Sequence, residues 1–285
     1  MTKQTREEKL CSLDEMCRRM RLSALKMALG AGNNGAHIGP ALSCIEIMAV
    51  LYGEVMHIDP HNPQWPERDR FIASKAHCVL AHYSALREIG FITPEELETF
   101  EQNGSFLAGH PSVNLEKGLE YSGGSLGQAL PVGIGMALDA KQKGRENRVY
   151  ILLGDGECDE GSNWEAFMAA AHFGLGNLTA VIDKNTLQYD GTTDEIMGLG
   201  DLGAKLRAFG WAVSEIDGHD IRMLVDAFSV NTQEKPHAVI AHTVKGKGVS
   251  FMENVREWHH SRLTQQQYEL AVAEIKAGKG GDRLC

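Results

Sequence analysis

The chain has 285 residues, of which 43% are hydrophobic and 23% are charged, with a net charge of −10. This length and composition are typical of a globular protein built around one large α/β domain, and the negative charge argues against nucleic acid as a partner. The polar amino terminus lacks the apolar core of a signal peptide and no apolar run is long enough to span a bilayer, so we expect a cytoplasmic protein with no membrane segment.

Short apolar runs alternate with amphipathic patterns along most of the chain. In chain order they predict helices over 8–30 and 43–55, a strand over 71–73, helices over 77–89 and 126–143, a strand over 149–153, a helix over 163–173, and strands over 178–183 and 238–242. Strands of this length separated by helices indicate a parallel sheet with crossover connections. We predict a three-layer α/β fold, helix–parallel sheet–helix, in which residues 1–260 form a single domain and 261–285 a C-terminal tail, loosely held after Tyr268.

Two polar turns follow neighbouring predicted strands. Asp155 ends the first strand and Asn185 ends the next. Because the carboxyl ends of parallel strands meet at one edge of a sheet, we expect these side chains to lie close together. A carboxylate, an amide oxygen and the main-chain carbonyl of Leu187 are oxygen ligands that suit Mg²⁺ bound to a diphosphate. Gly154 and Gly156 would let backbone N–H groups approach phosphate oxygens.

The Gly-Asp-Gly…Asn pattern is similar to the thiamine diphosphate motif of transketolases and their relatives. Lys184 departs from it, because many relatives have a first Asn there, whereas Asn185 keeps the ligand role. The resemblance implies the pyrophosphate-binding domain of the thiamine diphosphate-binding fold, with Mg²⁺, Ca²⁺ or Mn²⁺ held by Asp155, Asn185 and the Leu187 carbonyl. The residues then expected to contact the cofactor are His77, Gly124, Ser125, Leu126, Gly154, Asp155, Gly156, Glu157, Asn185 and His259.

Four histidine-bearing segments narrow the resemblance to the transketolase N-terminal domain, over residues 21–260. They read NNGAHIGPALS, RDRFIASKAHCVLAHYSAL, FLAGHPSV and FMENVREWHHSRL. The combination LAGHPS…GGSLGQAL most closely resembles the short subunits of split bacterial transketolases. The resemblance implies that the catalytic residues around the reactive ring and the sugar hydroxyls are His37, His77, His110 and His259. Imidazole suits proton transfer near neutral pH, and His260 is an alternative to His259.

Several positions depart from the family pattern or stay open. Ala36 and Ala76 stand where Gly is usual, and Ser125 where full-length transketolases commonly have Pro, so these departures are expected to line the sugar pocket and not the metal site. Lys245 and Lys247 are interpreted either as ligands of a phosphate or as part of a solvated glycine-rich turn. The remaining histidines are interpreted as structural or surface groups: His57, His61, His82, His172, His219, His237 and His242.

A second domain is expected to be missing. In this family a pyrimidine-binding domain holds the other ring of the cofactor and supplies a Glu to it, and too few residues follow Trp258 to form one. We therefore expect the N-terminal subunit of a two-subunit transketolase, assembled as a heterotetramer with a separate pyrimidine-domain polypeptide. It would transfer a two-carbon ketol unit from a ketose (phosphate) to an aldose (phosphate).

Three alternatives remain open from the sequence. One is a transketolase subunit for an unusual sugar, such as an apulose phosphate or a sulfonated ketose. Another is the α subunit of a 2-oxo-acid dehydrogenase first component, which carries a similar motif but lacks the histidine segments. The third is a nucleotide-binding module, although the partial G-x-G pattern at 133–138 does not follow a predicted strand.

Overall fold

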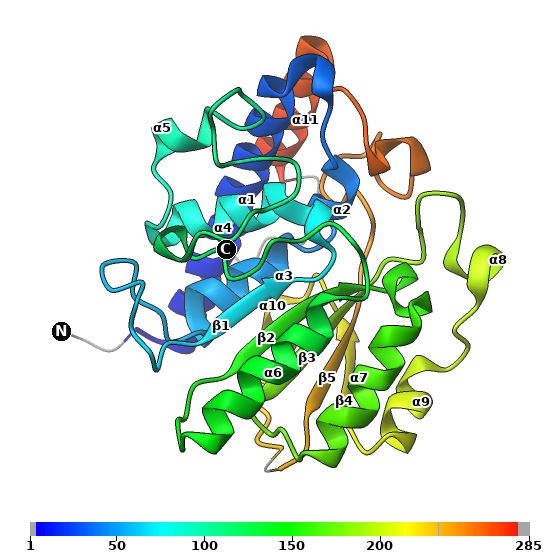
Figure 1. Cartoon of the computed structure of the whole chain (residues 1–285). Helices are drawn as coiled ribbons and strands as arrows, with labels where there is room; N and C mark the ends of the chain where they lie inside the picture. The colour runs from blue at the N-terminus through cyan, green and yellow to red at the C-terminus, as the bar shows by residue number, and fades with distance from the viewer. Residues whose placement is uncertain (1–3, 233, 279–285) are drawn as a thin grey trace.

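A single parallel sheet of five strands, in the order β1-β2-β3-β5-β4, forms the centre of the computed structural model, which describes residues 4–232 and 234–278 (Figure 1). The strands are β1 (Arg70–Ala73), β2 (Val149–Gly154), β3 (Leu178–Lys184), β4 (Ala212–Asp217) and β5 (His237–His242). All four neighbouring pairs are parallel. The predicted α/β class and parallel sheet are therefore confirmed.

Helices cover both faces of the sheet. The α-helices are α1 (Arg6–Gly30), α2 (Ile38–Leu42), α3 (Ile45–Val50), α4 (Val79–Ile89), α5 (Pro94–Leu97), α6 (Ala129–Gln142), α7 (Gly161–His172), α8 (Thr193–Met197), α9 (Leu202–Ala208), α10 (Ile221–Phe228) and α11 (Gln265–Ala277). Shorter helical turns are η1 (Gly32–Asn34), η2 (Leu51–Val55), η3 (Ala76–Cys78), η4 (Leu115–Lys117), η5 (Gly156–Asp159) and η6 (Arg256–His259). Within the described residues, none of these helices is long and apolar enough to cross a membrane.

The strands separate two hydrophobic cores because successive side chains of a strand point to opposite faces. In β2, Tyr150 and Leu152 pack into the core formed with α1, α3, α4 and α10. Val149, Ile151 and Leu153 pack into the other core, with α6, α7 and α9. A strand buried on both faces needs a continuous apolar run, which is the signal that predicted β2, β3 and β5 from the sequence.

Among the elements that were not predicted are β4, α10 and α11. β4 is an edge strand whose side chains are mostly part-exposed, so it lacks a buried apolar run. α10 is capped by Asp220, whose carboxylate accepts from two backbone N–H groups of the first turn. α11 lies within the segment assigned to a tail: it starts with a capping box at Thr264, and Ala271 and Ile275 are buried in the core shared with α1. Residues 279–285 lie outside the described part, and the boundary at 260 stays a prediction.

The glycines of α6 differ in what surrounds them. A Cβ on Gly133 would lie 2.4 Å from Cδ1 of Ile151 in β2, whereas a Cβ on Gly135 would meet nothing within 4 Å. We expect Gly133→Ala to destabilise the chain by about 1–3 kcal/mol through overpacking, and Gly135→Ala to stabilise it by roughly 0.5–1 kcal/mol through helix propensity. Urea unfolding of both variants measures this, and equal stabilisation by the two would show that α6 does not press on β2.

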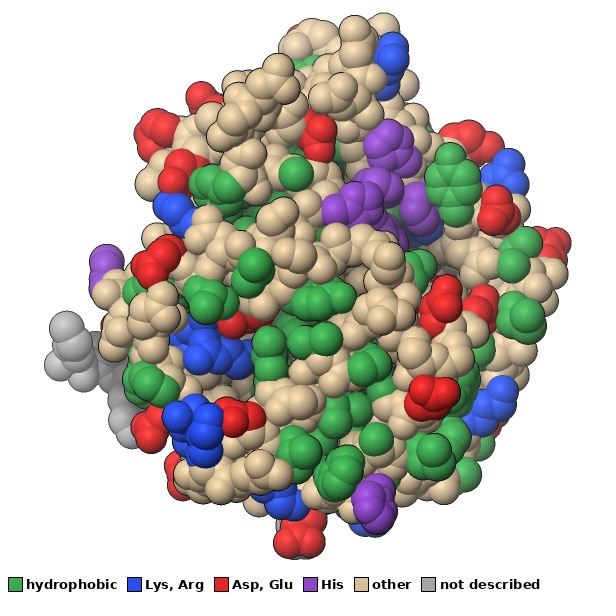
Figure 2. All heavy atoms as spheres, viewed as in Figure 1, with side chains coloured by type: hydrophobic (Ala, Val, Ile, Leu, Met, Phe, Trp, Pro, Cys, Tyr) green, Lys and Arg blue, Asp and Glu red, His purple; other side chains and the backbone are tan. Residues whose placement is uncertain are grey.

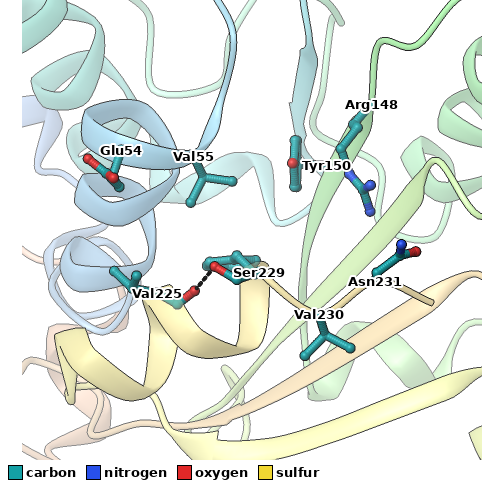
Figure 3. A pocket seen from close by; sticks show the side chains of 9 residues that line it. Glu54, Val55, Arg148, Tyr150, Val225, Ser229, Val230 and Asn231 are labelled. Atoms are coloured by element: carbon teal, nitrogen blue, oxygen red, sulfur yellow. Dashed lines mark hydrogen bonds between the residues drawn. The ribbon is translucent and has the colours of Figure 1, made fainter. Parts of the chain in front are cut away.

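A cavity of about 440 Å³ opens at the amino-terminal edge of the sheet (Figure 3). Arg148 and Tyr150 line one side and α10 lines the other, where the Ser229 hydroxyl donates to the Val225 carbonyl at 2.7 Å. The cavity contains none of the residues predicted to bind the cofactor or metal. Those residues lie beyond the opposite ends of the strands.

Candidate active site

The two polar turns meet at the carboxyl edge of β2 and β3, which pair from Val149↔Leu178 to Gly154↔Asp183. The Asp155 carboxylate accepts from the backbone N–H of Thr186 at 2.6 Å and from that of Gly156 at 3.0 Å. The Asn185 side-chain oxygen accepts from the Leu187 N–H at 3.2 Å. Asp155 and Asn185 are both buried. The structure therefore brings together the three residues predicted as metal ligands.

The Leu187 carbonyl faces a lysine. Thr186 has a φ of 63°, a left-handed conformation that is uncommon for a β-branched residue. The Lys245 ammonium donates to the Leu187 carbonyl at 2.7 Å and lies 3.0 Å from Nδ1 of His259. Lys245 is buried, and its burial and the nearby Lys75 lower its pKa to about 8. The interpretation of Lys245 as part of a solvated turn is therefore wrong, because its side chain is buried.

The acidic groups of the glycine-rich turn have few positive partners. Burial and the neighbouring Asp183 raise the pKa of Asp155 to about 6. Glu157 is also buried, which raises its pKa, but its oxygens accept from Gly127 N–H at 3.0 Å, from Gly154 N–H at 3.1 Å and from Ser74. Glu157 thus holds the turn together, while Asp155 is a buried carboxylate that a bound cation would stabilise.

Five histidine rings form a cluster beside this turn, visible as the purple patch in Figure 2. The ring of His37 lies 4.5 Å from that of His260, 5.4 Å from His110, 5.5 Å from His77 and 5.6 Å from His259. His77 and His259 stack at 5.1 Å. The four predicted histidines therefore lie together. His259 and His260 both lie beside His37, so both rings belong to the cluster.

Most of the cluster is uncharged at neutral pH. Burial, with the neighbouring His260, His110 and Lys245, lowers the pKa of His37 to about 3. Burial and the adjacent Lys245 lower the pKa of His259 to about 3, and burial lowers that of His77 well below its usual value. Neutral imidazoles can both donate and accept a hydrogen bond, so the cluster suits hydroxyl groups and proton transfer.

Segments distant in the chain bring these rings together. Ala36 and Ser261 exchange two backbone hydrogen bonds, at 2.9 and 3.0 Å, which places His37 beside His260. The segment 124–126, expected to line the cofactor, lies next to the His110 turn: a Cβ on Gly124 would be 3.9 Å from the His110 ring. These pairings join segments far apart in the chain, so local patterns in the sequence do not reveal them.

A buried ion pair beneath the site was missed from the sequence. Lys75 and Asp183 pair with side chains that are about 1% and 0% exposed. The Ser43 hydroxyl donates to Asp183 at 2.6 Å, Thr243 donates to its other oxygen, and Lys75 also donates to the Pro40 carbonyl at 2.9 Å. The only signal in the sequence was that Lys75 and Asp183 lie at or just beyond the carboxyl ends of predicted strands. The pair connects the ends of β1, β3 and β5 directly below His77 and Asn185.

Comparison with known proteins agrees with this geometry. Residues 14–280 match the family model described as the thiamine diphosphate binding domain of transketolase. The chain belongs to the transketolase family. It is 45% identical over 241 residues to one subunit of the apulose-4-phosphate transketolase of Phocaeicola vulgatus, covering 84% of this chain and 85% of that protein. It is 42% identical over 250 residues to a 6-deoxy-6-sulfo-D-fructose transketolase subunit of a Clostridium species, covering 87% and 90%.

Full-length transketolases share the fold but are longer. Human transketolase is 35% identical over 94% of this chain and 43% of its own length. The structure of the Leishmania mexicana transketolase superimposes with a TM-score of 0.84 at 28% identity, covering 95% of this chain and 42% of that one. The chain thus spans less than half the length of these enzymes. These matches confirm the predicted transketolase family, thiamine diphosphate-binding fold and enzyme class. They do not support the 2-oxo-acid dehydrogenase subunit or the nucleotide-binding module.

Proposed function

We propose that this chain is the diphosphate-binding subunit of a two-subunit transketolase. It transfers a two-carbon ketol unit from a ketose phosphate, or a related anionic ketose, to an aldose acceptor. The observation that carries the proposal is the histidine cluster, which contains the neutral rings of His37, His77 and His259, next to the Asp155–Asn185 turn at one edge of the sheet. Such a cluster suits a sugar rich in hydroxyl groups, and the turn suits a metal-bound diphosphate.

The chain's own groups fit thiamine diphosphate with a divalent metal. Asp155, Asn185 and the Leu187 carbonyl would hold Mg²⁺, Ca²⁺ or Mn²⁺, because this donor set consists only of oxygen and includes the buried Asp155 carboxylate, whose pKa burial and Asp183 raise to about 6. The Leu187 carbonyl also accepts from the Lys245 ammonium at 2.7 Å, and its second lone pair remains for a metal. When bound, thiamine diphosphate supplies the carbon nucleophile for carbon–carbon cleavage.

The histidines then bind and orient the sugar. The neutral rings of His37, His77 and His259 accept hydrogen bonds from hydroxyl groups and take up or return protons at the reacting oxygens. His110 and His260 are positioned on the other sides of His37 to contact more distant hydroxyls. These roles are the ones that the resemblance to transketolases implies for the histidines at these positions.

A partner subunit is supported by exposed apolar side chains around the site. They lie in the loop after His110, in the first turn of α6, and in the segment that follows Asn185 and Leu187: Val113, Leu115, Val132, Tyr189, Ile196 and Met197. Figure 2 shows hydrophobic side chains scattered over the face below the histidine cluster. Exposed apolar area of this kind marks interaction sites. We infer that a pyrimidine-domain subunit covers it, in a heterotetramer; the names of two relatives, which are transketolase subunits, support a separate partner polypeptide.

The relatives also suggest the kind of sugar. By name, one acts on apulose 4-phosphate and another on 6-deoxy-6-sulfo-D-fructose, both of which carry a terminal anionic group. Ala36 and Ala76 alter the two histidine segments relative to the usual glycines, and Ala76 packs against the 123–126 turn, where a Cβ on Gly123 would lie 2.6 Å from it. We therefore keep a ketose other than the common pentose phosphates as the second candidate substrate.

The test is reconstitution of the two-subunit enzyme. The chain is assayed with thiamine diphosphate and Mg²⁺, alone and after co-expression with a pyrimidine-domain polypeptide encoded beside it. The donors are xylulose 5-phosphate, apulose 4-phosphate and 6-deoxy-6-sulfofructose, with pyruvate as a control. We expect ketol transfer only from the complex. Robust transfer by the chain without its partner would contradict the two-subunit architecture. Activity with pyruvate and with none of the three ketoses would contradict the proposed ketol transfer.

Replacement of His110 tests the sugar role separately from the cofactor role. We expect His110→Ala to lower the turnover of the complex about 100-fold, because a proton-transferring or orienting imidazole is lost, with cofactor affinity unchanged. Steady-state kinetics and calorimetric titration with thiamine diphosphate measure the two quantities. His172→Ala, at the end of α7 and away from the histidine cluster, is the matched control. A large loss of cofactor affinity in His110→Ala would count against the assignment.

A further inference from the structure

The loop that carries Lys245 is held from below by a buried polar network. The loop follows β5 and leads into the segment of His259 and His260. Nε2 of His219 accepts from the backbone N–H of Val244 at 2.8 Å, one residue before Lys245. Nε of Arg21 donates to the carbonyl of Lys247 at 3.3 Å, two residues after it. Lys245 is thus bracketed on both sides by contacts to its own backbone neighbours.

The hydrogen bonds define the state of the His219 ring. Because Val244 donates to Nε2, that nitrogen carries no proton, and the proton of the neutral ring is on Nδ1. Nδ1 then donates to the Glu46 carboxylate at 3.0 Å. The backbone N–H of His219 donates to Asp217 at 2.8 Å, which sets the turn at the end of β4. The ring therefore links a carboxylate on α3 to the backbone of the Lys245 loop.

The other end of the network is anchored in the core. Glu46 pairs with Arg21 of α1, and both side chains are less than 10% exposed. Burial alone would raise the pKa of Glu46, but Arg21 and His219 outweigh it and lower that pKa to about 2. Arg21 also lies against Gly248, where a Cβ would be 2.8 Å from its Nε. Three residues from α1, α3 and the β4–α10 turn thus act on one loop.

We propose that His219, held by Glu46 and Arg21, is a positioning residue that sets the Lys245 ammonium against the Leu187 carbonyl and His259. The proposal rests on the cofactor site of the proposed function and extends it to a residue that touches neither cofactor nor substrate. Lys245 contacts both the Leu187 carbonyl of the proposed metal site and His259 of the histidine cluster. A displacement of its loop would therefore weaken the diphosphate site without removing any of its ligands.

The test compares His219→Phe, Lys245→Met and the double variant. Phenylalanine keeps the ring's volume but cannot accept from Val244. We expect His219→Phe to weaken thiamine diphosphate binding in the presence of Mg²⁺ on the order of tenfold, measured by calorimetry on the full chain with its partner. We expect no further loss when His219→Phe is added to Lys245→Met, because the group it positions is already absent. His219→Gln, whose side-chain oxygen can accept from Val244, should recover most of the affinity.

His237→Phe is the matched control. His237 is also buried, and its Nε2 also forms a hydrogen bond, with the Ser214 hydroxyl at 3.0 Å. It is the first residue of β5, at the end of that strand opposite the Lys245 loop. His237→Phe should lower thermal stability without changing cofactor affinity. A full tenfold loss of affinity from His219→Phe in the Lys245→Met background would overturn the proposal, as would unchanged affinity in His219→Phe alone. Absence of ketol transfer in an otherwise cofactor-binding wild type would instead contradict the proposed function.

Discussion

Asp155→Asn is expected to weaken Mg²⁺-dependent thiamine diphosphate binding by on the order of 100-fold or more, since even indirect partners of a metal ligand contribute 10- to 100-fold to metal affinity. The substitution keeps the size of the side chain and one acceptor for Thr186 or Gly156, but it removes the only carboxylate among the three predicted ligands. Calorimetric titration with the cofactor, with and without Mg²⁺, measures the effect. The loss should appear only with the metal present.

The matched control lies in the same loop. Asp190 is exposed and four residues from Thr186, so Asp190→Asn removes the same charge without touching the turn. We expect its affinity to equal that of the wild type. Full affinity of Asp155→Asn with Mg²⁺ present would show that the metal is held elsewhere. Within the described residues no group of three or more His, Cys, Asp or Glu side chains offers an alternative, so the mixed oxygen set carries the whole prediction.

Lys75→Met is expected to lower the free energy of unfolding by about 3–5 kcal/mol, because it leaves the Asp183 carboxylate buried without its cation. Burial would raise the pKa of Asp183, but Lys75 outweighs it and holds that pKa below its usual value, so the carboxylate stays charged at neutral pH. Ser43 and Thr243 still donate to it, but neither supplies a charge. Urea unfolding measures the loss.

Two further variants separate the effect of burying the Lys75–Asp183 pair from the effect of leaving one of its charges without a partner. Lys26 forms an ion pair with Glu98 at 2.5 Å with both side chains about 60% exposed, so Lys26→Met should cost less than about 1 kcal/mol. In an Asp183→Asn background, Lys75→Met should cost less than in the wild type, because the uncompensated charge is gone. Equal effects of Lys75→Met and Lys26→Met would show that the buried pair contributes no more than a surface pair.

The same buried pair supports the active site. Lys75 is two residues before His77, and Asp183 is two residues before Asn185. The pair therefore lies next to both the histidine cluster and the proposed metal ligands. We infer that the buried pair fixes the ends of β1, β3 and β5 relative to one another, and that this offsets the free energy lost when the two charges are desolvated. This account agrees with the fact that its further partners come from two other segments: Pro40 and Ser43 lie in and just after α2, and Thr243 follows β5.

Local patterns in the sequence determined the elements that are buried on both faces or strongly periodic. β2, β3, β5, α1 and α7 were predicted because each presents a continuous apolar run or a regular apolar spacing. The edge strand β4 and helix α11 were not, because edge exposure and a mostly polar helix surface weaken those patterns. The cap at Asp220 follows from its residue type, since capping depends on the immediate neighbours alone.

Residue type and spacing along the chain also predicted the metal ligands, and the resemblance to transketolases predicted the four histidines. Only the tertiary structure decided that His260 joins them, that Lys245 is buried against Leu187, and that His219, assigned from the sequence to a structural or surface role, links Glu46 to the Lys245 loop. The physical reason is that turns and ligand spacings are local properties of the chain, whereas burial, ion pairing and the tautomer of a histidine depend on partners that are distant in sequence.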